Sequence, residues 1–334
     1  MAEKLLLEYF CKTNIIIKMK GLSGTILLVL FVAASVSKTV AQQSGLRGHI
    51  SLSGAFALYP MAVKWAEEFR KLHPNVRIDI SGGGAGKGIT DALTGMVDLG
   101  MVSRAIHVEE IRRGAFVIPV AIDAVVPTIN AKHPRINDVL RRGISREAAN
   151  KIFITGEYKT WGDLLGTSYN APIRLFTRSD ACGAAETWAE YLGNKKQEDL
   201  LGTGVFGDPG LASAVQRNAL ALGYNNIAFA YNSRTRKPNT GLIVLPIDIN
   251  SNGRVDPEEN FYATSDQLVK AIADGRYPSP PARELYLVSR GKPQKPVVVA
   301  FIRYILTEGQ KFNVPLGFVN LTKESLNRTL ESLK

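Results

Sequence analysis

Three glycine-rich turns, each followed by a helix-like pattern, carry the residues of this chain that are best suited to chemistry. They span Ser53–Pro60, Ser81–Gly88 and Arg178–Trp188. The start of a helix leaves backbone N–H groups unpaired and carries about half a positive charge, and glycine lets the backbone approach a ligand closely. Since Arg104 and Arg178 lie close by in the sequence, the turns predict a site that surrounds a small anion.

Other chemistries fit the same residues less well. The second turn, SGGGAGKG, superficially resembles a nucleotide-binding P-loop, but that motif needs glycine in place of Ser81 and serine or threonine in place of Gly88. The four histidines are not paired at metal-binding spacing, and the sequence contains no nucleophile elbow. We therefore predict that the protein is not an enzyme. A phosphatase is the enzymatic alternative, because anion sites also serve phosphoryl transfer.

A second group of oxygen-bearing residues matches the twelve-residue calcium loop. In that loop, oxygen ligands occupy positions 1, 3, 5 and 9, glycine occupies position 6 and glutamate position 12. The preceding LIVLPI indicates a strand instead of the usual first helix, so a plain turn at Asn252-Gly253 is the alternative. We expect a structural Ca²⁺ and no cofactor for the function itself. The candidate metal ligands are Asp248, Asn250, Asn252, Arg254, Asp256 and Glu259.

The start of the chain indicates export. Within residues 1–41, lysines precede an apolar run from Ile26 to Ala34, and small residues follow up to Ala41. This is the layout of a secretory signal peptide, here cleaved near Ala41, and the run is short for a membrane span. An uncleaved anchor is the alternative. The exported chain would keep a single cysteine, Cys182, and therefore no internal disulfide.

The charge of the chain suits an anionic ligand better than a nucleic acid. The net charge is +11 over 334 residues, and a basic surface attracts anions. The basic residues are, however, spread along the chain without a block or an interleaved aromatic platform, so no nucleic acid partner is predicted.

The elements that would position the three turns follow an α/β order. Strand, glycine-rich turn and helix occur twice in succession, which indicates a parallel sheet flanked by helices. The first helix begins at Pro60 and has Trp65, Phe69 and Leu72 on its apolar face. The prolines of the long apolar run 116–129 suit a strand that passes between two lobes better than a central strand. Strands are predicted at 48–53, 76–81, 97–102, 116–129, 173–177, 227–231, 242–249 and 285–289, and later helices at 147–153 and 297–306, the last as the closing helix.

The order of the turns resembles the periplasmic phosphate-binding protein of ABC-type phosphate importers. The resemblance extends from about Gly48 to Leu321 and is carried by GAFALYPMAVKWAEEF, ISGGGAGKGI, VDLGMVSR, ANKIFITGEYKTWGDL, RSDACGAAETW and PPARELYLVSRGK. It implies a type II periplasmic-binding-protein fold: an α/β clamshell of two lobes, each a mixed, mostly parallel sheet flanked by helices, with two crossover strands as hinge. The implied domains are 42–127 and 283–334 for the first lobe and 128–282 for the second.

The same resemblance implies a function. Proteins of this family close on phosphate and deliver it to a membrane permease. We therefore expect a periplasmic, monomeric solute-binding protein that captures an oxyanion, with phosphate as the first candidate, for an ABC importer. A receptor or sensor of the same fold for a different anion is the alternative.

The sequence departs from the family at the hydroxyl groups that would hold phosphate. Ala57 and Leu58 stand where the first turn of the family carries a serine or threonine, and Ala85 replaces a serine in the second. The third turn has Cys182-Gly183-Ala184 in place of Ser-Gly-Thr, and Arg104 follows Ser103 where some members have an aspartate. These replacements favour binding through backbone amides, or a larger anion with an apolar portion. The predicted ligand contacts are Ala55, Ala57, Leu58, Gly84, Ala85, Gly86, Lys87, Ser103, Arg104, Arg178, Cys182, Gly183 and Ala184.

Overall fold

The computed structural model describes residues 45–334, of which residues 46–334 form one compact unit. The predicted signal peptide and its cleavage point lie outside the described residues. The helices are α3 (Tyr59–Leu72), α4 (Gly84–Thr94), α5 (Val108–Arg112), α6 (Ile136–Arg142), α7 (Arg146–Phe153), α8 (Trp161–Leu165), α9 (Gly183–Tyr191), α10 (Gly207–Arg217), α11 (Ile227–Ala230), α12 (Ser265–Ala273), α13 (Pro296–Leu306) and α14 (Lys323–Ser332). The strands are β1 (Gly48–Gly54), β2 (Val76–Gly82), β3 (Leu99–Val102), β4 (Ala115–Asn130), β5 (Ile144–Ser145), β6 (Arg174–Arg178), β7 (Thr203–Val205), β8 (Ala221–Asn226), β9 (Leu242–Val244), β10 (Ile247–Asp248) and β11 (Ala282–Arg290).

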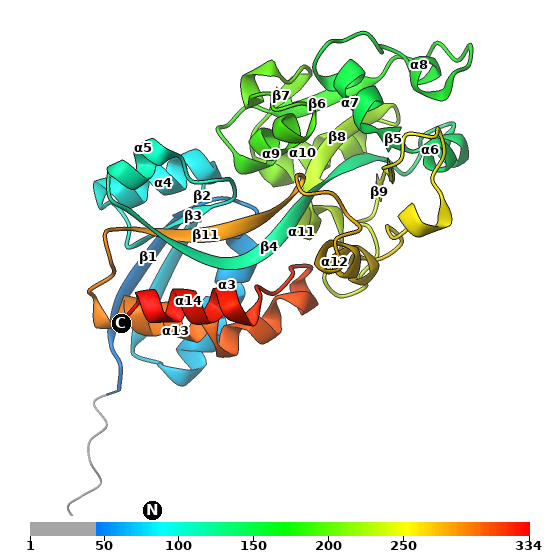
Figure 1. Ribbon diagram of the computed structural model, residues 1–334. Helices are drawn as coiled ribbons and strands as arrows, with labels where there is room; N and C mark the ends of the chain where they lie inside the picture. Colours follow the sequence, from blue (N-terminus) through cyan, green and yellow to red (C-terminus); the bar gives the residue numbers. More distant parts are fainter. Residues whose placement is uncertain (1–44) are drawn as a thin grey trace, which may run out of the picture. The chain divides into compact units, whose positions relative to one another are not determined.

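One mixed sheet of nine strands runs through this unit. Its order is β2-β1-β3-β11-β4-β8-β6-β7, and β9 also pairs with β4. As predicted, β1 is parallel to β2 and β3. Strand β6 is parallel to β7 and β8, which were not among the predicted strands. The two long strands β4 and β11 lie side by side and antiparallel, and they connect the two halves of the sheet (Figure 1). The mixed α/β architecture is therefore the predicted one.

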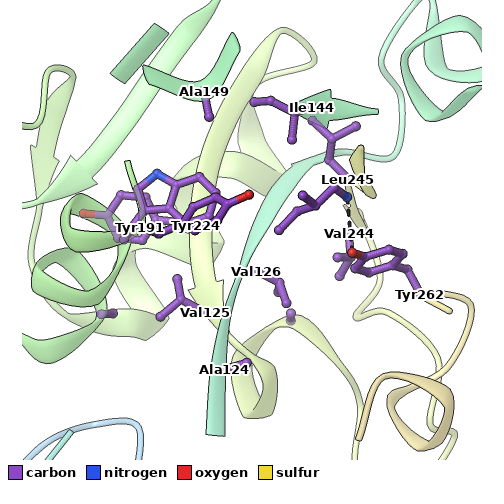
Figure 2. Close-up of a cluster of buried hydrophobic side chains, with 14 of the residues drawn as sticks. Ala124, Val125, Val126, Ile144, Ala149, Tyr191, Tyr224, Val244, Leu245 and Tyr262 are labelled. Carbon is purple, nitrogen blue, oxygen red and sulfur yellow. Dashed lines mark hydrogen bonds between the residues drawn. The ribbon is translucent and has the colours of Figure 1, made fainter. Parts of the chain in front are cut away.

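Buried side chains fall into two main clusters, which define two lobes. The first lobe has a core built from residues before Ile122 and after Glu284, including Trp65 and Phe301. The core of the second lobe lies almost entirely between Ala124 and Ala282. Around β4 in that core, Tyr191 and Tyr224 lie on one side of the strand, and Val244, Leu245 and Tyr262 lie on the other (Figure 2). The change of core thus occurs within β4 and β11, close to the predicted domain boundaries, whose exact positions stay a prediction.

Helix α3 illustrates how the sequence produces the first core. Pro60 lies in its first turn, where the missing N–H costs nothing. Trp65 and Phe69 are buried, and the Trp65 ring nitrogen donates a hydrogen bond of 3.0 Å to the carbonyl of Gly309. Leu72, predicted on the same face, is 61% exposed, because the helix ends there and the chain turns away at His73.

Strand β4 is central, contrary to the prediction from its prolines. It pairs with β11 in its first part and with β8 and β9 on opposite edges in its last part, and it also passes from one lobe to the other. The sheet tolerates Pro119, which cannot donate a hydrogen bond, because the register with β11 shifts between Leu285 and Tyr286, beside this proline.

Three predicted elements differ from the structure. Residues 227–231 were predicted as a strand but contain α11, and the strand is β8, immediately before it. Strand β8 was not predicted because two asparagines, Asn225 and Asn226, interrupt its apolar pattern. Both are buried because their amides are hydrogen-bonded, for example Asn225 with the Thr128 hydroxyl at 2.8 Å. The predicted strand 242–249 is two short strands, β9 and β10, separated at Pro246. Helix α13 is not the closing helix, since α14 follows it.

Candidate functional site

The three glycine-rich turns meet where the two lobes face each other. The N–H of Gly86, in the first turn of α4, donates a hydrogen bond of 3.3 Å to the carbonyl of Ala181, in the third turn. A Cβ added to Gly183 would overlap the carbonyl oxygen of Ser103 in the first lobe. The ring of Phe56, in the first turn, lies against Gly82 in the second. The structure therefore brings together three segments that are far apart in the sequence, as predicted.

Arg178 lies at the centre of this meeting point and is fully paired. Its Nε and one terminal nitrogen donate to the two oxygens of Asp180 at 2.8 and 2.5 Å, and the other terminal nitrogen donates to Asp208 at 2.6 Å. The side chain is 1% exposed. Burial opposes the charge of Arg178, but the carboxylates of Asp208 and Asp180 hold its pKa above the ordinary value. Two carboxylates thus surround one guanidinium, and this group of three carries a net negative charge.

Phe56 of the first lobe lies over the arginine and contacts Phe206 of the second lobe. The Arg178 guanidinium carbon lies 5.8 Å from the ring centre of Phe56, within cation–π range. Phe56 in turn meets the exposed ring of Phe206 edge-on, with ring centres 6.1 Å apart. Phe56 therefore lies between the lobes next to the predicted anion position.

A chain of buried polar groups links this site to the hinge strands. Asp208 accepts a hydrogen bond of 2.5 Å from the Asn226 amide, and the carbonyl oxygen of that amide accepts one from Arg283 on β11. Arg283 also donates to the carbonyl of Gly183, at 2.7 Å, and lies 3.7 Å from Asp123 on β4. Neither oxygen of the Asp123 carboxyl has a hydrogen-bonding partner among the described residues. The hinge therefore contains a buried acid that is only loosely paired.

The buried Asp123 carboxyl should make the stability of the folded protein depend on pH. Burial raises the pKa of this carboxyl to about 7, from an ordinary value of 3.8. The folded protein therefore binds this proton more tightly than the unfolded chain does. The contribution of Asp123 to stability is complete below about pH 4 and is lost as the pH rises to about 7. We expect the free energy of unfolding of the wild type to fall across this range relative to Asp123→Asn. Urea unfolding of both proteins from pH 4 to pH 8 measures this, and parallel curves would contradict it.

The other two predicted cations are also paired within the chain. Arg104 makes a bidentate pair with Glu110, at 2.6 and 2.9 Å, and lies 3.2 Å from Glu186. Lys87 pairs with Asp91 one turn along α4 and is half-exposed. Each cation that was predicted to supply charge to an anion thus has a carboxylate partner in this structure.

The predicted apolar contacts lie in the cores of the lobes. The side chains of Ala55, Ala57, Leu58 and Ala85 are buried in the core of the first lobe, so only their backbone is available to a ligand. Ala184 and Cys182 are buried in the core of the second lobe.

Cys182 has a structural role at the start of α9. Its sulfur accepts a weak hydrogen bond of 3.4 Å from the N–H of Ala185, in the first turn of the helix. Burial raises the pKa of the Cys182 thiol to about 12, so the group is neutral at physiological pH. The replacement of a hydroxyl by this thiol keeps the helix cap and weakens its hydrogen bond.

A pocket of about 590 Å³ lies beside the second and third turns and is lined by both lobes. The first lobe contributes Gly86, Arg104 and His107, and the second contributes Cys182 and Glu186, among others. Of the predicted contacts, Gly86, Arg104 and Cys182 therefore border one accessible space. The side chain of Arg178 is not part of its lining.

The acidic residues of the predicted calcium loop accept hydrogen bonds from the backbone of the same loop. Asp248 accepts the N–H groups of Asn252 and Gly253, and Glu259 accepts those of Ile249, Asn250 and Asp256. Within residues 45–334, no three His, Cys, Asp or Glu residues form a group suited to a metal ion. Of the other candidate ligands, Asn250 and Asn252 donate side-chain hydrogen bonds to Asp256, and Arg254 pairs with it. Calcium binding stays a prediction.

Residues at the site that were not among the predicted contacts include Phe56, Asp180, Asp208, Asn226, Arg283 and Asp123. Asp208 carried a usable signal, since an acidic residue in the first turn of a helix, here α10, stabilises the helix start. Arg283 carried none, because only the pairing of β11 with β4 brings it opposite Asp123.

Comparisons with known proteins agree with this architecture. The family described as PBP superfamily domain matches residues 39–308. The chain is 27% identical to Protein SphX of Synechococcus elongatus, over 89% of this chain and 85% of that protein. It is 26% identical to the phosphate-binding protein PstS of Pseudomonas aeruginosa PAO1, over 87% and 88%. The resemblance found in the sequence is confirmed by these matches.

A solved structure shows the same fold. It is that of a putative phosphate ABC transporter substrate-binding protein with bound phosphate from Clostridium perfringens. The TM-score is 0.68 at 23% identity, over 82% of this chain and 100% of that one. The predicted fold class is therefore confirmed.

Proposed function

Because the chain belongs to the PBP superfamily, we propose that it is the solute-binding component of an ABC importer and captures an oxyanion, phosphate first, between its two lobes. The observation that carries this proposal is the meeting of the three turns. Helices α4 and α9 begin there, Arg178 lies among them, and contacts cross from one lobe to the other. Relatives named phosphate-binding proteins, matched over most of their length, support phosphate as the ligand.

The proposal includes where the protein acts. A solute receptor for an importer works outside the cytoplasm, in keeping with the export segment predicted at residues 1–41. No helix among residues 45–334 has both the length and the apolar character needed to span a bilayer. We propose a periplasmic monomer whose closed form is recognised by a membrane permease, and we propose no enzymatic activity.

Calorimetric titration of the chain from Gln42 onward with phosphate tests this function. We expect phosphate to bind more tightly than about 1 mM, a free energy of about −4 kcal/mol, and more tightly than sulfate or molybdate. The endogenous ligand is removed first by partial unfolding and dialysis. Absence of heat with all three anions, in a protein that unfolds cooperatively, would contradict the proposal.

A larger anion is the second candidate, and one observation favours it. The pocket of about 590 Å³ is of the size that proteins use for organic ligands, and it exceeds what inorganic phosphate fills. Titration with a phosphonate that carries an alkyl group separates the two candidates: tighter binding than phosphate would identify an organic ligand. Hydrolysis of a chromogenic phosphate ester would identify the phosphatase alternative.

A further inference from the structure

The predicted anion site already contains an anionic side chain, Asp208, which pairs with Arg178. Asp208 lies in the first turn of α10 and is 2% exposed. One carboxylate oxygen accepts a hydrogen bond from Arg178 at 2.6 Å, and the other accepts one from Asn226 at 2.5 Å. A carboxylate held by a guanidinium, an amide and a helix start has the surroundings that a bound oxyanion would have.

An oxyanion that reaches Arg178 must displace something, because the guanidinium is buried. Asp180 is held by two bonds from the arginine and by a third, of 3.0 Å, from the N–H of Gly207. Asp208 is held by only one bond from the arginine. Since breaking one charged hydrogen bond costs less than breaking two, Asp208 is the carboxylate that gives way.

The ring of Phe56 covers the other approach to the arginine. It lies over the guanidinium and is packed against Gly82 of the first lobe and Gly207 of the second. A ligand of the size of phosphate therefore cannot reach Arg178 unless this ring also moves. Phe56 belongs to the first lobe and contacts Arg178 and Phe206 of the second, so its contacts hold the lobes together without a ligand.

We propose that Asp208 is an internal competitor for the oxyanion and, with Phe56 as a cover, sets the affinity of this receptor. The inference rests on the proposed function, because it assumes that an oxyanion enters between the lobes. It goes beyond the proposed function because it assigns the control of oxyanion affinity to Asp208 and Phe56, which are not among the predicted contacts. The cost of displacing Asp208 is the same for every oxyanion that reaches Arg178, so this residue lowers the affinity for all of them by the same factor.

The test is titration of phosphate into Asp208→Asn. Asparagine keeps the shape of the side chain and its contact with Asn226, but it removes the charge that opposes the ligand. We expect phosphate to bind about tenfold more tightly than to the wild type, a gain of about 1.4 kcal/mol. The matched control is Asp266→Asn on α12, whose side chain is 57% exposed. It changes the net charge equally and should alter the affinity less than about twofold, because exposed charges are screened.

Thermal unfolding gives an independent readout and checks that the variants fold. Without phosphate, Asp208→Asn should unfold at a lower temperature than the wild type, since a buried charge pair is lost. With saturating phosphate the difference should shrink or reverse. Phe56→Ser serves as a second variant and should also bind phosphate more tightly, because the cover is removed.

The outcomes separate the inference from the proposed function. Tighter binding by Asp208→Asn supports both. Phosphate binding that is equal or weaker in Asp208→Asn and Phe56→Ser, while the wild type binds, overturns the competitor role and leaves the function in place. If no folded variant binds phosphate or the alkyl phosphonate, both are overturned.

Discussion

Replacing Arg178 by alanine should abolish oxyanion binding and strongly destabilise the second lobe. The guanidinium is buried between Asp180 and Asp208, and its removal leaves two carboxylates without a counter-charge in a site that water does not reach. Removing one partner of a buried ion pair typically costs about 3–5 kcal/mol. Calorimetric titration measures the loss of binding, and urea unfolding measures the loss of stability.

Two further variants show whether charge is the cause. Arg178→Lys keeps a cation at this position but cannot make the bidentate pair with Asp180, so it should retain more stability than alanine and bind phosphate weakly. Combining Arg178→Ala with Asp208→Asn should recover part of the lost stability, because one unpaired carboxylate is gone. A wild-type free energy of unfolding in Arg178→Ala would show that the ion pairs of this site contribute little.

Replacing Gly183 by alanine should hold the lobes apart. A methyl group there would overlap the carbonyl oxygen of Ser103 in the facing lobe, and a backbone carbonyl cannot move aside as a flexible side chain can. Gly183 is the first residue of α9 and has no positive φ, so alanine is permitted by the backbone. We expect a loss of phosphate affinity of about 100-fold or more, equivalent to about 2.7 kcal/mol, and a larger radius of gyration in small-angle scattering.

Gly210→Ala in α10 is the matched control. Its added methyl group would meet only the side chain of Val205, at 3.0 Å, within the same lobe. This variant should keep the wild-type radius and bind phosphate as the wild type does. If Gly183→Ala behaves in the same way, the contact between Gly183 and Ser103 is not required for closure.

Local patterns were sufficient for most of the elements that position the site. Helices α3 and α4, strands β1 to β3 and the return strand β11 were predicted within a few residues, since apolar spacing, Pro60 and the glycines act over short distances. The prediction failed at β8, where Asn225 and Asn226 interrupt the apolar pattern. Their burial depends on partners such as Thr128 and Asp208, which lie elsewhere in the sequence and are invisible to a local pattern.

The features of the site also separate into those that the sequence predicts and those that depend on the tertiary structure. The amino-acid sequence alone determined that three glycine-rich turns begin or precede helices and that Arg178 accompanies the third. The resemblance to the family added that Ala85, Cys182 and Ala184 stand where its members carry hydroxyl groups. Only the tertiary structure decided how the charge of Arg178 is used. Asp208 and Phe56 reach the arginine because α10 and the first turn fold toward it from opposite lobes, and Arg283 meets Asp123 because β11 pairs with β4. Glycine spacing acts within one turn of chain, whereas the pairing of buried charges depends on which distant segments the sheet and its helices bring together.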